Sequence, residues 1–156
     1  MKTIKILIAS ILCGAFAIST AHVQAQTQRQ DQEQIEQWDN HHQLASRALG
    51  DWVKAHPQAA HYIFEWDGHH PDRSQQFVTW AIDHPRENLA VFHAQHKDWP
   101  EMDEIEKTHK DATEAFLHWC RTYGPAARAL MAHPGALRWA GDHLYKDYLT
   151  MEHPNK

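Results

Sequence analysis

A tryptophan recurs every fourteen residues in the first half of this chain, and a histidine follows each one four positions later. The tryptophans are Trp38, Trp52, Trp66 and Trp80, and the histidines are His42, His56, His70 and His84. Proline comes directly after the last three of these histidines. Four copies in register indicate an internal structural repeat, because ordinary composition does not produce a fixed period of this kind.

The prolines exclude a reading of this region as one long helix. Inside a helix, proline removes a backbone hydrogen bond and clashes with the preceding turn, at a cost of about 3 kcal/mol or more. At the first position of a new helix, by contrast, proline is well accommodated. We therefore expect a helix boundary at each interior proline, with the tryptophans of the repeat buried. These prolines are Pro57, Pro71, Pro85, Pro100, Pro125 and Pro134.

Between the prolines, apolar residues recur with helical spacing, as in the series Phe77, Trp80, Ala81 and His84. Two longer stripes predict one helix over about 35–52 and one over about 101–123. No segment alternates with the period of a strand. The sequence therefore predicts an all-α fold, a compact array of short antiparallel helices with a 14-residue Trp-x-x-x-His-Pro repeat. Its structural unit would be a helical pair of about 28 residues, as in α-solenoids.

The first 25 residues have the layout of a secretory signal peptide. Lys2 and Lys5 precede an apolar run that is too short to span a bilayer, and small residues lead to Ala25. We expect cleavage there, then a Gln-rich disordered tether over 26–34, a single helical-repeat domain over 35–150 and a tail over 151–156. The mature protein would be exported, either periplasmic or secreted, with no membrane-spanning segment of its own.

Charge and cysteine content narrow the classes of partner. The net charge is −5 with histidine neutral, and the leader removes two lysines and no acidic residue, which leaves −7. This sign argues against nucleic acid and anionic lipid, so a partner would be another exported protein. Cys120 is the only cysteine after the leader, so an internal disulfide is excluded.

Histidine content carries the functional prediction, because 14 of the 15 histidines lie beyond the predicted leader. Neutral imidazole together with carboxylate suits zinc, copper or nickel as a divalent metal ligand set. In an antiparallel array, junctions 28 residues apart fall at the same end, which brings two His-His doublets together. The first candidate metal site therefore comprises His41, His42, His69 and His70, completed by Asp67 or water.

A second candidate metal site is the set His93, His96 and His109, which lie on the apolar faces of their helices. We expect these inward rings to be buried and neutral, so that acid would destabilise the fold. Haem ligation by an inward histidine also stays open, although covalent attachment is excluded because Cys-x-x-Cys-His is missing.

Two functions follow from these observations. The first is buffering or carriage of a divalent transition metal by an exported, histidine-rich helical protein. The alternative is a non-enzymatic helical-repeat module that binds another protein, with histidines that are structural or pH-responsive. An enzyme is the less favoured class, because the chain has no His-Glu-x-x-His, no Gly-x-Ser-x-Gly and no phosphate-binding glycine loop.

Overall fold

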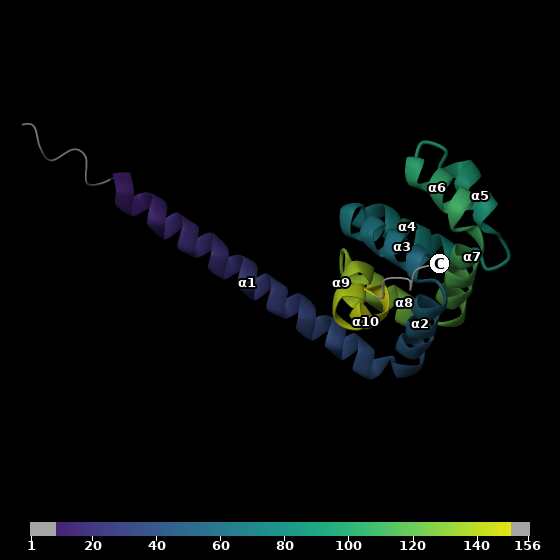
Figure 1. Ribbon diagram of the computed structural model, residues 1–156, viewed down its shortest axis with the longest axis horizontal. Coiled ribbons are helices and arrows are strands. Elements are labelled where there is room, and N and C mark those ends of the chain that lie inside the picture. Colours follow the sequence, from purple (N-terminus) through teal and green to yellow (C-terminus); the bar gives the residue numbers. More distant parts are fainter. Residues whose placement is uncertain (1–8, 151–156) are drawn as a thin grey trace, which may run out of the picture. The chain divides into compact units, whose positions relative to one another are not determined.

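All regular secondary structure in the described residues, 9–150, is helical, which confirms the predicted all-α class (side chains are described from residue 20 onward). The computed structural model has ten helices in this range (Figure 1): α1 (Ala9–His41), α2 (Gln43–Ala55), α3 (Pro57–His69), α4 (Pro71–Asp83), α5 (Leu89–Gln95), α6 (Pro100–Thr108), α7 (Lys110–Thr122), α8 (Gly124–Met131), α9 (Ala136–His143) and α10 (Lys146–Leu149). Four of them, α2, α3, α4 and α7, are each 13 residues long.

The chain divides into two compact units, one ending at Gln34 and the other beginning at Ile35. Residues 26–34, which the sequence analysis assigned to a disordered tether, are helical and belong to α1. Glutamine and glutamate have good helix propensity, and this stretch contains no proline or glycine to end a helix. The start of the predicted leader and the tail at 151–156 lie outside the described residues. Among the residues that are described, no helix is long and apolar enough to cross a membrane.

Several consecutive helices in the second unit are joined through a single residue, and we call these residues, together with His84 directly after α4, junction residues. The first four are the repeat histidines His42, His56, His70 and His84, with φ between −121° and −135° and ψ between 42° and 63°. The backbone N–H of each donates to the carbonyl of the tryptophan four residues earlier, at 2.8–2.9 Å. The carbonyls of the first three accept from the residue four positions later. Each of those three residues therefore ends one helix and begins the next without leaving its own backbone groups unpaired.

The interior prolines lie at helix boundaries, as expected. Pro57 and Pro71 are the first residues of α3 and α4, and Pro100 is the first residue of α6. At these positions the missing N–H costs nothing, since the first N–H groups of a helix have no intrahelical partner.

The two long helices predicted over 35–52 and 101–123 are wrong, because each is broken at a histidine. His42 separates α1 from α2, and His109 separates α6 from α7 with φ −123° and ψ 20°. Tyr123 forms a further junction between α7 and α8, with φ −114° and ψ 40°. A junction residue keeps its hydrogen bonds on both sides, so this kind of bend does not require proline, and a search for prolines misses it.

Tryptophan indoles fix the contact between α2 and α7. Trp38 of α1 donates its Nε1–H to the carbonyl of Ala126 in α8 at 2.8 Å; between α2 and α7, Trp119 near the end of α7 donates to the carbonyl of Ala45 in α2 at 2.9 Å. At the other end of the pair, Trp52 donates to the carbonyl of Ala112 at 2.8 Å. The start of α2 therefore lies beside the end of α7, and the end of α2 lies beside the start of α7. The two helices are thus antiparallel.

Helices α3 and α9 approach each other closely through Gly141. A Cβ atom at this position would lie 2.6 Å from Cδ2 of Phe64, far inside van der Waals contact. The small residue lets the backbone of α9 lie against α3, and this places the N-terminus of α9 beside the end of α3.

Helices α5 and α6 form a corner of the second unit beside α7 (Figure 1). Phe92 of α5 anchors this corner, with its ring 4.9 Å from the rings of Phe77 and Trp80 in α4. Trp99, which precedes α6, is also buried and lies 5.8 Å from the ring of Phe92. The corner is therefore attached to the main core through aromatic packing.

We predict that Trp52→Phe destabilises the protein more than Trp80→Phe does. Both tryptophans are buried, at 6% and 8% exposure, and both substitutions remove the same atoms. Trp52 would lose its hydrogen bond to Ala112, whereas Nε1 of Trp80 is buried without a partner among the described residues. The difference in unfolding free energy should be about 1–3 kcal/mol, measured by urea denaturation. Equal losses, or a larger loss at Trp80, would contradict the role assigned to the indole N–H.

Candidate functional site

His41 and His69, the first members of the two doublets, are exposed and share one arrangement. Nδ1 of His41 lies 2.6 Å from the carbonyl oxygen of Gln37, and Nδ1 of His69 lies 2.7 Å from that of Glu65. A carbonyl oxygen can only accept, so Nδ1 carries the proton in both rings. In the neutral ring the lone pair is therefore on Nε2.

The second members of the doublets have different surroundings. His42 lies against the ring of Trp38, with 5.9 Å between ring centroids. Nε2 of His70 lies 3.1 Å from Oε1 of Glu101, a carboxylate that also accepts from Arg73 at 3.0 Å. The two members of a doublet are thus not equivalent, since one is turned outward and the other has partners within the fold.

Asp67, the carboxylate assigned to the first candidate site, is fully buried and binds the N-terminus of α9. Its Oδ2 accepts from the backbone N–H groups of Leu137 at 2.9 Å and Arg138 at 3.2 Å, and its Oδ1 accepts from the hydroxyl of Ser74. Burial raises the pKa of this carboxyl group, and the three hydrogen bonds oppose the rise. Because the N-cap residue of α9 is Gly135, which has no side chain, Asp67 supplies the missing capping group from α3.

The first candidate site is not assembled as a metal centre in the described part of the chain. No group of three or more His, Cys, Asp or Glu side chains there is arranged to hold a metal ion. The doublet site and the inward site both stay predictions.

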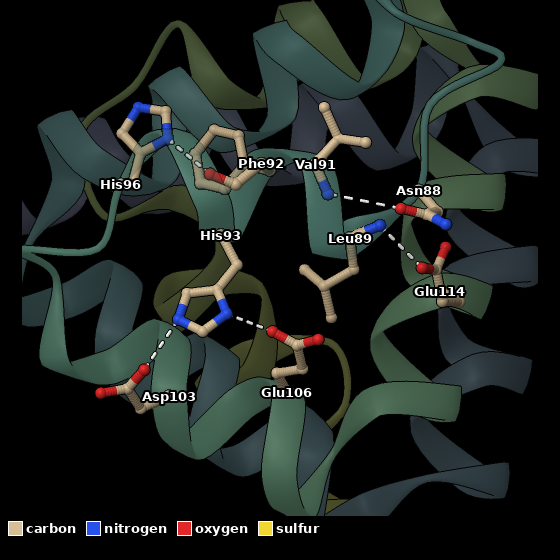
Figure 2. Close-up of polar contacts among 9 residues, drawn as sticks. All are labelled: Asn88, Leu89, Val91, Phe92, His93, His96, Asp103, Glu106 and Glu114. Atoms are coloured by element: carbon tan, nitrogen blue, oxygen red, sulfur yellow. Dashed lines mark hydrogen bonds and ion pairs between the residues drawn. The ribbon is translucent and has the colours of Figure 1, made fainter.

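His93 is held between two carboxylates of α6 (Figure 2). Its Nδ1 contacts Oε2 of Glu106, and its Nε2 lies 2.7 Å from Oδ1 of Asp103. An ionised carboxylate only accepts, so these two contacts favour a proton on each ring nitrogen, which is the imidazolium form. Burial by itself would lower the pKa of His93, but the hydrogen bonds and the attraction of Glu106 and Asp103 outweigh it and raise the pKa above 6.5.

The expectation of a neutral, buried His93 is therefore wrong. The side chain is 23% exposed and its charge is compensated, which reverses the predicted pH dependence. A raised folded pKa gives stability that is present below pH 6.5 and is lost as pH rises through the folded pKa. With both nitrogens engaged, His93 has no free lone pair for a metal, and we leave it out of the metal proposal below.

His96 and His109, the other members of the second candidate site, do not point towards His93. In Figure 2 the ring of His96 is turned away from His93, and its Nδ1 donates to the carbonyl of Phe92 at 2.9 Å. His109 is a junction residue whose ring lies 5.2 Å from that of Tyr62.

The structure also shows a class of histidines that the sequence analysis did not recognise. His84 and His143 are exposed, and their Nδ1 atoms donate to the carbonyls of Trp80 and Trp139, both at 3.0 Å. Together with His41 and His69 they form a set of four, which we call the helix-end histidines. Each is the last residue of a helix or follows it, and its ring bonds the carbonyl one turn earlier in the same helix. The sequence feature that could have revealed this class is a histidine at the end of an apolar stripe with helical spacing.

The remaining reactive groups give no support to catalysis. Cys120 is fully buried, and burial raises the pKa of its thiol, which keeps it protonated. Comparison with known proteins gives no match to a protein family, a curated protein or a solved structure. The function must therefore be argued from the side chains themselves.

We predict that Asp67→Ala destabilises the protein by about 1–3 kcal/mol, because it leaves two backbone N–H groups at the start of α9 without their partner. Asp67→Asn is the matched control, since its amide oxygen can still accept from both groups and its loss should be clearly smaller. Thermal unfolding of both variants at neutral pH measures this. If the two variants are equally stable, Asp67 does not cap α9.

Proposed function

We propose that this protein buffers a divalent transition metal, zinc, copper or nickel, through its four helix-end histidines. The observation that carries the proposal is the common state of these rings, which have Nδ1 bonded to a backbone carbonyl and are exposed. This hydrogen bond leaves Nε2 as the free ligand atom. A metal-bound histidine in proteins typically donates its other N–H in the same manner, which fixes the tautomer and the ring orientation.

Such rings would bind metal as separate, open sites. Each imidazole supplies one bond of about 2.0–2.1 Å to zinc, and water or a ligand from another molecule completes the coordination. Several weak sites of this kind suit buffering better than tight storage, because they release the metal easily. Since the imidazole must be neutral to bind a metal, affinity should weaken as the solution becomes more acidic.

The predicted leader puts the proposed activity outside the cytoplasm, in the periplasm or as a secreted protein. We also attribute the recurring unit to duplication of one helix with its junction histidine. The equal lengths of α2, α3, α4 and α7 and the similar backbone angles of the junction residues support this interpretation.

A second candidate function is a non-enzymatic helical module that binds another exported protein. Its support is that many histidines have partners within the fold, such as Trp38 for His42 and Tyr62 for His109. In that case the histidines serve stability or pH response, and metal binding would be incidental.

We predict that the protein, produced without an affinity tag, binds more than one equivalent of Zn(II) or Cu(II), and that replacing the four helix-end histidines with glutamine removes most of this capacity. The matched control replaces four half-buried junction histidines with glutamine: His42, His56, His70 and His109. Isothermal titration calorimetry at pH 7.5, with circular dichroism to confirm folding, measures the effect.

The outcomes separate the hypotheses. Loss of capacity in the helix-end variant alone supports buffering by these rings. A single tight equivalent that disappears in His69→Ala/His70→Ala supports the doublet site, and one that disappears in His93→Ala/His96→Ala supports the inward site. If the native protein binds no metal in this titration, the proposed metal function is wrong and the interaction module replaces it.

A further inference from the structure

Among the described histidines, His93 is the one recorded with a carboxylate at both ring nitrogens, whereas His70 contacts a single carboxylate, that of Glu101. The helix-end rings donate to neutral carbonyls, which accept from either protonation state of the ring. His93 donates to two carboxylates, Glu106 and Asp103, and both belong to α6. The ring itself belongs to α5, so these contacts connect two separate helices (Figure 2).

We propose that His93 is a proton-dependent clamp that holds α5 against α6. In the protonated state the imidazolium donates to both carboxylates and neutralises part of their charge. In the neutral state one ring nitrogen loses its proton, and its lone pair then faces a carboxylate oxygen at hydrogen-bonding distance. The contact is then repulsive.

Deprotonation of His93 would also leave the carboxylates of Asp103 and Glu106 without a cation to offset their mutual repulsion. Asp103 and Glu106 are three residues apart on α6 and lie on one face of the helix, where like charges destabilise. The charge of His93 offsets this repulsion only while the ring is protonated. The loss of one proton thus weakens the corner in two ways, by removing an attraction and by restoring a repulsion.

The other charged groups around α5 do not take over this role. Helix α7 contributes Glu114, which accepts from the backbone N–H of Leu89 at 2.7 Å, and Arg121, which donates to the carbonyl of Glu87. Helix α4 meets α5 through aromatic rings, Phe77 and Trp80 against Phe92. Among the described residues, the charged partners recorded for His93 itself are the two on α6.

Aromatic packing limits the size of the change. Phe92 is 1% exposed and stays anchored to α4, so the corner should loosen locally while the core remains folded. The raised pKa of His93 places the transition above pH 6.5, and the stabilising contact is present below that value. The released form would present the acidic face of α6 free of its cation.

The test is amide hydrogen exchange across pH, together with NMR titration of the His93 ring. We expect a ring pKa above 6.5, and protection factors in α5 and α6 that fall by about two- to fivefold relative to α7 as pH rises through it, the range given by partly exposed ion pairs. His93→Gln should remove this pH dependence. His96→Gln is the matched control, because its ring is bonded to a backbone carbonyl, and it should retain the dependence.

Glu106→Gln provides an independent check, since it removes one of the two charges without shortening the side chain. The pKa of His93 should fall in this variant and the pH dependence should shift with it. A His93 pKa at or below 6.5 in the native protein would overturn the proposal. So would protection in α5 and α6 that changes equally in the native protein and in His93→Gln.

Discussion

The fold depends on the backbone hydrogen bond between a junction residue and the residue one turn before it, which is aromatic at every junction named above except His109. In the first four junctions, the N–H of the histidine donates to the tryptophan carbonyl, while the tryptophan ring is buried in the core. The same residue holds the end of the helix and anchors it to neighbouring helices. Two of these indoles, those of Trp38 and Trp52, also donate to carbonyls of other helices, and the indole of Trp119 in α7 does the same. At these four junctions the bend and the core packing thus depend on one repeated pair of residues.

The sequence predicted those parts of the fold that depend on local chemistry. Proline placed boundaries at α3, α4 and α6, because proline is excluded from helix interiors whatever the tertiary context. The breaks at His42 and His109 could not be predicted in this way, since the following residues, Gln43 and Lys110, are ordinary helix residues. There the bend is selected by packing between helices distant in sequence. The role of Asp67 was missed for the same reason, as its partners lie about 70 residues away in α9.

Histidine in this protein serves two chemical roles that composition cannot separate. At the helix ends a ring donates from Nδ1 to the backbone carbonyl one turn earlier, and in the neutral state it keeps a free lone pair on Nε2. At the α5–α6 corner, His93 has carboxylates at both nitrogens, and they raise its pKa and favour the protonated ring. Spacing along the helix places both kinds on comparable stripes, so the sequence analysis grouped His93 with His96. The hydrogen-bond acceptor distinguishes the two roles. A ring that donates to one carbonyl keeps a nitrogen for a metal, whereas a ring between two carboxylates favours protonation.

The tautomers and protonation states of the histidine rings test this account most directly. Long-range ¹H–¹⁵N NMR spectra of the side chains distinguish the Nδ1–H form, the Nε2–H form and the imidazolium. The account predicts that the neutral rings of His41, His69, His84 and His143 are in the Nδ1–H form and that at pH 6.5 more than half of His93 is protonated at both nitrogens. Nε2–H tautomers at the helix ends, or a neutral His93 under the same conditions, would contradict it.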